Sequence, residues 1–147
     1  SYHKFRDGLG AVVYEDPWLA GGHNGLSNAE DPRKPEPPLP RIVELRKQMN
    51  EFGLQTTPIV MAGGVWFLRE WSDFIGNPDV GPIAFQFGTR PLLTKESPIS
   101  TEWKQRLLHL KKGDILLHRF SPTGFYSSAV INPFLRELDE RSKRQIP

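Results

Sequence analysis

Residues 57–64 of the chain, Thr57-Pro-Ile-Val-Met-Ala-Gly-Gly64, decide which fold we expect. The apolar, β-branched run up to Met61 is typical of a buried strand, and it ends at two glycines. The segment from Trp66 to Ile75 then carries aromatic side chains at helical spacing, which predicts a helix. A strand that passes through a glycine turn into a helix is the repeating unit of α/β proteins.

The same alternation extends to both sides of this stretch. Apolar runs predict further strands over 11–15, 83–87 and 114–120, and helical periodicity predicts helices over 40–53 and 101–113 and from Asn132 onward. Strands that alternate with helices predict a parallel sheet, with the carboxyl ends of all strands at one edge. Because α/β proteins bind ligands at this edge, the residues just after each strand form the candidate site.

Composition narrows the class of protein. The 147 residues fit one domain, and the hydrophobic share of 37% is too high for a disordered chain. The absence of cysteine excludes disulfides and thiol catalysis and is compatible with a cytoplasmic location. The net charge of +2 comes from dispersed side chains, so we expect no nucleic-acid partner. The longest apolar stretch, Ile59 to Leu68, is too short to span a membrane, and no metal-ligand spacing is present.

A proline-rich segment interrupts the alternation. Five prolines lie between Asn24 and Pro40, and they exclude both a helix and a central strand there. We therefore expect a long extended loop, of the kind that is usually functional or disordered in a compact domain.

Two strand ends carry small residues that suit an anion. Gly63-Gly64 follows one predicted strand and Gly88-Thr89 follows the next. Glycine lets a backbone approach a ligand closely, and free amides there attract phosphate. A tight turn without a ligand explains either pair alone, whereas two such turns on neighbouring strands favour a phosphate site.

His23 is the candidate catalytic residue. It lies in the stretch Gly21-Gly-His-Asn-Gly25, after the first predicted strand. Its ordinary pKa near 6.5 lets a neutral imidazole accept a proton, and the small neighbours leave room for a ligand. The alternative is a turn histidine that bonds a backbone carbonyl. The pattern favours a structural role for His118, inside a strand, and core positions for Trp66, Trp71 and Trp103.

Three stretches together resemble the nitronate monooxygenase family, formerly the 2-nitropropane dioxygenases, which are FMN-dependent TIM-barrel enzymes. They are Ala20-Gly-Gly-His-Asn-Gly25, Pro58-Ile-Val-Met-Ala-Gly-Gly-Val65 and Phe85-Gln-Phe-Gly-Thr-Arg90. Glu96-Ser-Pro98 and the run from His118 to Arg136 fit as well. The resemblance extends in order along nearly the whole chain.

The resemblance implies a role for each matching residue. His23 would remove the proton next to the nitro group, or orient the nitronate. FMN would be held by a set of small residues, of which Gly22 would lie near the flavin ring and the others around the phosphate: Gly22, Ala62, Gly63, Gly64, Gly88 and Thr89. In this family, electrons pass from a nitronate or nitroalkane through FMN to O₂, which yields a carbonyl compound and nitrite.

A complete (β/α)₈ barrel needs about 250 residues, so the chain is expected to be part of a larger enzyme. Residues 1–112 would supply about strands 6 to 8, and residues 113–147 would form a C-terminal extension. The remaining strands would come from missing sequence or from another chain. Two alternatives stay open. One is another FMN barrel oxidoreductase, such as an enoyl-thioester reductase, and the other is a non-catalytic module that binds a phosphate ligand or a protein.

Overall fold

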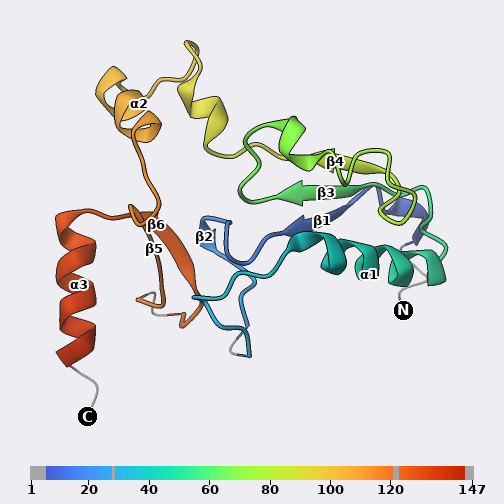
Figure 1. Cartoon of the computed structure of the whole chain (residues 1–147), viewed down its shortest axis with the longest axis horizontal. Coiled ribbons are helices and arrows are strands. Elements are labelled where there is room, and N and C mark those ends of the chain that lie inside the picture. The colour runs from blue at the N-terminus through green and yellow to red at the C-terminus, as the bar shows by residue number, and fades with distance from the viewer. Residues whose placement is uncertain (1–5, 28, 121–122, 145–147) are drawn as a thin grey trace.

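The computed structural model describes residues 6–27, 29–120 and 123–144. These residues form a mixed α/β fold with three α-helices and two three-stranded sheets, as Figure 1 shows. The parallel sheet has the order β1-β3-β4, with β1 at Val12–Glu15, β3 at Ile59–Ala62 and β4 at Ile83–Phe85. The antiparallel sheet has the order β2-β6-β5, with β2 at Gly22–His23, β6 at Ser127–Val130 and β5 at Ile115–His118.

The parallel sheet confirms the three strands predicted over 11–15, 57–61 and 83–87. Glu15 pairs with Ala62 across β1 and β3, and Met61 pairs with Phe85 across β3 and β4. The amide of Gln86 continues the ladder by donating to the Met61 carbonyl at 2.8 Å. The strands therefore end together, and the turns that follow them meet at one edge, as the sequence predicts.

Helix α1 (Pro38–Glu51) covers one side of this sheet (Figure 1). It begins two residues before the predicted start, so the prediction of an extended loop up to Pro40 is wrong at that end. Prolines at the first positions of a helix lose no hydrogen bond, because those amides have no partner within the helix. The core lies between α1, the sheet and the segment after β3, and consists of Ile42, Met49, Leu54, Ile59, Met61, Val65, Trp71, Phe74 and Val80.

Arg46 is buried on the inner face of α1, where helical periodicity predicts an apolar residue. Its side chain is 3% exposed and lies among backbone carbonyls. Its guanidinium donates to the carbonyls of Val80 at 2.7 Å, Pro82 at 2.9 Å, Thr57 at 3.0 Å and Leu54 at 3.1 Å. Burial lowers the pKa of Arg46 from its ordinary value. The side chain thus ties α1 to the segments that precede β3 and β4.

The helix predicted over 66–75 is wrong. The structure has a short 3₁₀ helix, η3 (Leu68–Trp71), followed by turns in which the Phe74 amide donates to the Trp71 carbonyl at 3.0 Å. The Trp71 ring packs against Phe74 at 5.0 Å and against Phe85 at 5.7 Å. Aromatic residues are modest helix formers, so the burial of these rings decides the backbone path here.

Helix α2 (Thr101–Leu108) confirms the helix predicted from Thr101, although it ends earlier than expected. The Ser100 hydroxyl accepts from the Trp103 amide at 3.3 Å and so caps its first turn. No residue of α2 is buried, and Trp103 is 53% exposed, so the prediction that Trp103 lies in the core is wrong. The physical reason is that α2 stands away from the core, beside η4 (Arg90–Leu93), as Figure 1 shows.

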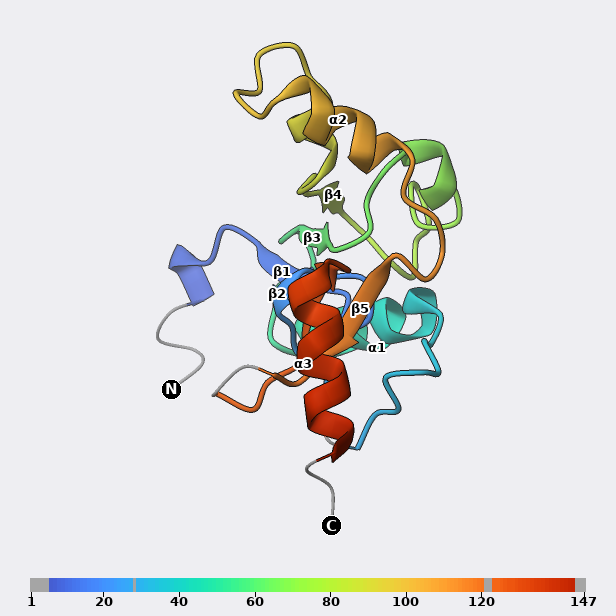
Figure 2. The ribbon, with the colours of Figure 1, turned by 90° about the vertical axis from the view of Figure 1, so that its left-hand side faces the viewer.

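The strand predicted over 114–120 exists as β5, but it does not join the parallel sheet. It pairs antiparallel with β6, with Leu117 opposite Ser128, because β5 and β6 are consecutive in the chain and form a hairpin. Helix α3 (Pro133–Arg144) follows and lies in front of β5 in Figure 2. Within the described residues, no helix is long and apolar enough to cross a membrane.

Candidate functional site

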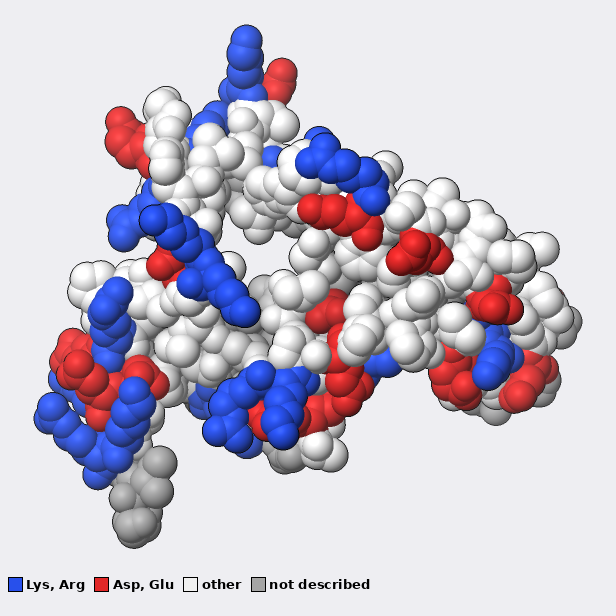
Figure 3. All heavy atoms as spheres, in the orientation of Figure 1, with Lys and Arg blue, Asp and Glu red and all other residues white. Residues whose placement is uncertain are grey.

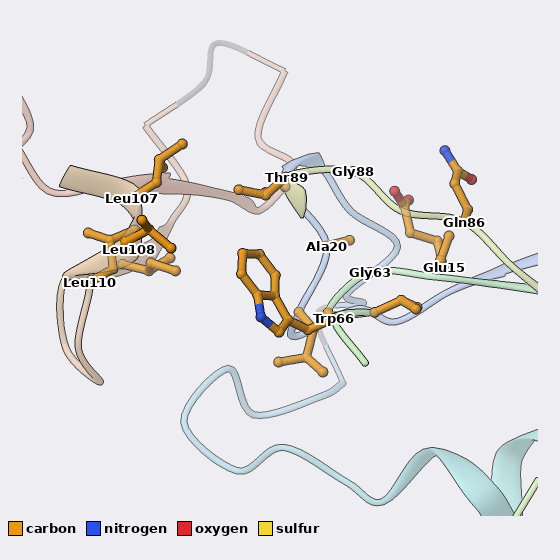
Figure 4. A pocket seen from close by; sticks show the side chains of 16 residues that line it. Glu15, Ala20, Gly63, Trp66, Gln86, Gly88, Thr89, Leu107, Leu108 and Leu110 are labelled. Atoms are coloured by element: carbon orange, nitrogen blue, oxygen red, sulfur yellow. The ribbon is translucent and has the colours of Figure 1, made fainter. Parts of the chain in front are cut away.

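A pocket of about 640 Å³ opens at the carboxyl edge of the parallel sheet (Figure 4). Its walls come from the ends of β1, β3 and β4, from the turns that follow them, and from the α2–β5 region on the opposite side. The lining residues are Glu15, Leu19, Ala20, Gly21, Ala62, Gly63, Gly64, Val65, Trp66, Gln86, Gly88, Thr89, Leu107, Leu108, Leu110 and Ile115. Five of the residues expected at the cofactor therefore line one pocket: Ala62, Gly63, Gly64, Gly88 and Thr89.

The turn after β3 needs both of its glycines. Gly63 has φ +86° and Gly64 has φ +71°, a left-handed conformation that other residues rarely adopt. A Cβ on Gly64 would lie 2.6 Å from Leu19 Cδ1, and one on Gly63 would lie 3.0 Å from the Ala20 nitrogen. The close packing of the 16–20 segment on this turn is thus one reason for the glycine pair, independent of any ligand.

Backbone amides without an acceptor are a second reason for glycine in the turns that line the pocket. In the part of the chain that the structure describes, the amides of Gly63, Gly64, Gly88 and Thr89 donate to no protein acceptor. These four residues all line the pocket. Successive unpaired amides at a turn attract the oxygen atoms of an anion. The two turns together therefore have the donors that a phosphate group requires.

Asp16 holds the wall on the β1 side, and the sequence patterns did not single it out. Its side chain is 2% exposed, and Oδ1 accepts from the amides of Trp18 at 2.9 Å and Leu19 at 3.0 Å. The Asp16 amide donates to Ala62 and its carbonyl accepts from Ala20. The available signal is the Asp16-Pro17 pair, because aspartate before proline often begins a turn whose amides it binds.

Arg90 connects the two glycine turns. Its Nη1 donates to the Trp66 carbonyl at 2.7 Å, and its guanidinium lies 5.2 Å from the ring centres of both Phe67 and Phe87. The residue after Thr89 thereby holds the turn after β4 against the turn after β3. Sequence reasoning gave Arg90 no role, since a single arginine in a loop carries no distinctive pattern.

Apolar side chains form the wall that faces the glycine turns. Figure 4 shows the Trp66 indole between the turns and the leucines of the α2 side, with Glu15 and Gln86 on the opposite side. Trp66 is half-buried, so its predicted place in the core is wrong, and it is a surface of the pocket instead. Anion donors beside an apolar wall suit a ligand with an anionic end and an apolar body.

Gly22 and His23 belong to the other sheet. Their backbones form β2, in which His23 pairs with Ser127 and Gly22 with Ser128. Gly21 lines the pocket, but Gly22, the residue expected near the flavin ring, is outside the lining. The side chain of His23 lies outside the described part of the structure. Along the chain, His23 follows two residues after Gly21, which lines the pocket.

His118 lies at the end of β5 and has structural contacts, in line with its predicted role. Its Nδ1 accepts from the Phe120 amide at 3.3 Å, and the two rings stack with their centres 4.6 Å apart. Its Nε2 is buried, with no hydrogen-bond acceptor among the described residues. Burial lowers the pKa of His118 below the ordinary 6.5.

This burial predicts a pH dependence of stability. The unfolded chain protonates His118 near pH 6.5, whereas the folded chain does so only at lower pH. Between these two values the unfolded state binds more protons, so the contribution of His118 to the free energy of unfolding decreases as the pH falls below 6.5. His118→Phe retains a stacking ring but has no group that titrates. In urea titrations from pH 7.5 to about 5, its free energy of unfolding is therefore expected to decrease less than that of the wild type. A slope in His118→Phe equal to that of the wild type would contradict the prediction.

The turn residues that line the pocket carry backbone amides and the Thr89 hydroxyl, which are donors that suit an anion. Among the described residues, no three His, Asp or Glu side chains are grouped to hold a metal ion. Comparisons of the chain with protein-family models, with curated proteins and with solved structures found no match.

Proposed function

We propose that this chain carries the FMN phosphate site of a nitronate monooxygenase-like flavin oxidoreductase. The observation that carries the proposal is the position of Gly63, Gly64, Gly88 and Thr89. These four residues line one pocket at the carboxyl edge of a parallel sheet, and their amides have no acceptor among the described residues. Neighbouring strand-end turns of this kind hold phosphate in TIM barrels, and the resemblance of the sequence points to the same family.

The parallel strands β1, β3 and β4 would then be consecutive strands of a (β/α)₈ barrel. In the described residues, β1 and β4 each have one partner strand, and each leaves one edge of the sheet open. A parallel sheet is ordinarily buried and flanked by further strands or helices. The other strands would come from sequence outside this chain or from another chain, and the assays below are made on that complete assembly.

The residues of this chain would bind and position the reactants. The turns after β3 and β4 would hold the phosphate, Trp66 and the leucine wall would exclude water, and His23 would accept the proton from the carbon that bears the nitro group. FMN, when bound, supplies the redox chemistry that carries electrons from the nitronate to O₂, giving a carbonyl compound and nitrite. The substrate would be a nitroalkane or its nitronate.

Gly88→Asp provides a direct test of the phosphate site. A Cβ at Gly88 meets no atom within 4 Å, so the carboxylate adds charge without steric strain. Its repulsion of the phosphate is expected to weaken FMN binding by about tenfold or more. The matched control is Gly88→Asn, which has nearly the same shape and no charge. FMN affinity is measured by flavin fluorescence quenching in both variants.

Riboflavin, which lacks the phosphate, distinguishes repulsion of the phosphate from general damage to the pocket, since either could weaken FMN binding. It is expected to bind the Asp and Asn variants equally, because the repulsion requires the phosphate. Equal FMN affinity of the two variants would exclude a phosphate at Gly88. Gly64→Asp is a poorer choice, because Leu19 would clash with any side chain there.

A further inference from the structure

A second pocket, of about 320 Å³, shares the lining residues Leu19 and Ile115 with the first. The two pockets are therefore adjacent. The rest of the lining of the second pocket comes from the turn after β1, the proline-rich segment, the α2–β5 connection and the antiparallel sheet: Trp18, Pro32, Pro35, Lys111, Lys112, Gly113, Leu117 and Ser128. None of these residues was assigned to a site from the sequence.

Apolar side chains make up most of the lining of this pocket, and Trp18 among them is held in place. Trp18 is 9% exposed, and its Nε1 donates to the Asp31 carbonyl at 3.0 Å. The Arg41 guanidinium lies 5.4 Å from the centre of the Trp18 ring. Pro32 and Pro35 extend this surface with rigid rings. Aromatic and proline rings lose little conformational entropy on binding, so these residues are preorganised to contact the apolar part of a ligand.

The rim of the pocket is cationic. Lys111 and Lys112 both line it, and in the described part of the chain neither ammonium has a hydrogen bond or an ion pair. The Asp114 carboxylate, which is nearby in sequence, accepts from the Lys111 amide at 2.7 Å. Figure 3 shows basic side chains over the segment that joins α2 to β5, beside a hollow in this face of the molecule.

A polar group in the wall also lacks a partner. The Ser128 hydroxyl is buried and makes no hydrogen bond within the described residues, although Ser128 lines the pocket. This oxygen has almost no accessible surface, so a ligand in the pocket would not contact it, and the inference does not use it. Apolar side chains and two lysines whose ammonium groups have no partner among the described residues thus line one small cavity.

We infer that this second pocket binds a small organic anion with a flat apolar body, such as an aromatic carboxylate. The ring would lie over Trp18 and the prolines, and the carboxylate would face Lys111 and Lys112. The inference does not depend on the FMN proposal, because it uses different polar groups.

The test uses 2-naphthoate and isothermal titration calorimetry on the 147-residue chain. We expect saturable binding that Lys111→Gln/Lys112→Gln weakens about tenfold, through the loss of two partly screened ion pairs. The control Lys47→Gln/Lys95→Gln removes the same charge outside the pocket and is expected to keep the wild-type affinity. The neutral amide of the same ring is expected to bind wild type about tenfold more weakly than the carboxylate.

Amide chemical shifts locate the site. Titration is expected to move the Gly113 and Ser128 resonances, and Gly88→Asp, in the first pocket, is expected to leave the affinity unchanged. The inference is overturned by absence of binding, by equal affinity of the lysine variant and wild type, or by shifts confined to the first pocket.

Discussion

Arg46→Met is expected to lower the free energy of unfolding by about 3–5 kcal/mol, because it removes a donor from four carbonyls at once, and those of Thr57 and Val80 have no other donor among the described residues. Methionine fills a similar length in the core but donates no hydrogen bond. The carbonyls of Leu54, Thr57, Val80 and Pro82 would lose their Arg46 donor together. Urea unfolding followed by circular dichroism measures the change.

The neighbouring residue provides the control for this variant. Lys47 lies on the exposed face of the same helix, where its ammonium is 3.7 Å from Glu44. Lys47→Met removes a charge without unpairing buried carbonyls, so its effect is expected to stay within about 0.5 kcal/mol. If both variants were equally stable, Arg46 would not hold the segments before β3 and β4.

His23→Asn is expected to lower the rate of oxidation of a neutral nitroalkane by about 10²–10⁴, the usual loss when a general base is removed. Oxidation of the pre-formed nitronate needs no proton abstraction, so the variant is expected to retain it. Oxygen uptake on both substrates, with FMN saturating, measures the two rates in the complete assembly.

The ratio of the oxidation rates on the two substrates distinguishes loss of the base from damage to the fold. A variant that merely damages the fold would lose activity on nitroalkane and nitronate alike, whereas loss of the base affects the nitroalkane alone. His109→Asn, at an exposed position at the end of α2, is expected to leave both rates unchanged. Equal nitroalkane rates for His23→Asn and wild type would reject His23 as the base.

Local sequence signals predicted the parallel sheet and the position of its glycine turns. The apolar runs before Gly63 and Gly88 form neighbouring strands, and residues of the turns after them line one pocket. These features depend on residues close together in the chain, namely an apolar run and the glycines directly after it. They can therefore be predicted from the sequence without tertiary information.

Other features depend on partners distant in sequence. The helical pattern around Arg46 gave no sign that carbonyls 8 to 36 residues away would surround its guanidinium. The aromatic periodicity of 66–75 predicted a helix, yet contacts of Trp71 with Phe85 favoured short turns. Strand β2 has two residues, too few for any period to be visible.

The amino-acid sequence by itself determined the three strands of the parallel sheet, strand β5 and the position of the glycine turns, because strand propensity and glycine turns are local properties. It did not predict β2 or β6. Tertiary structure alone decided that Trp66 faces a pocket while Trp103 faces solvent, and that Trp18, Lys111 and Ser128 share a second cavity. Burial and proximity arise only when distant segments pack together, so neither can be read from spacing along the chain.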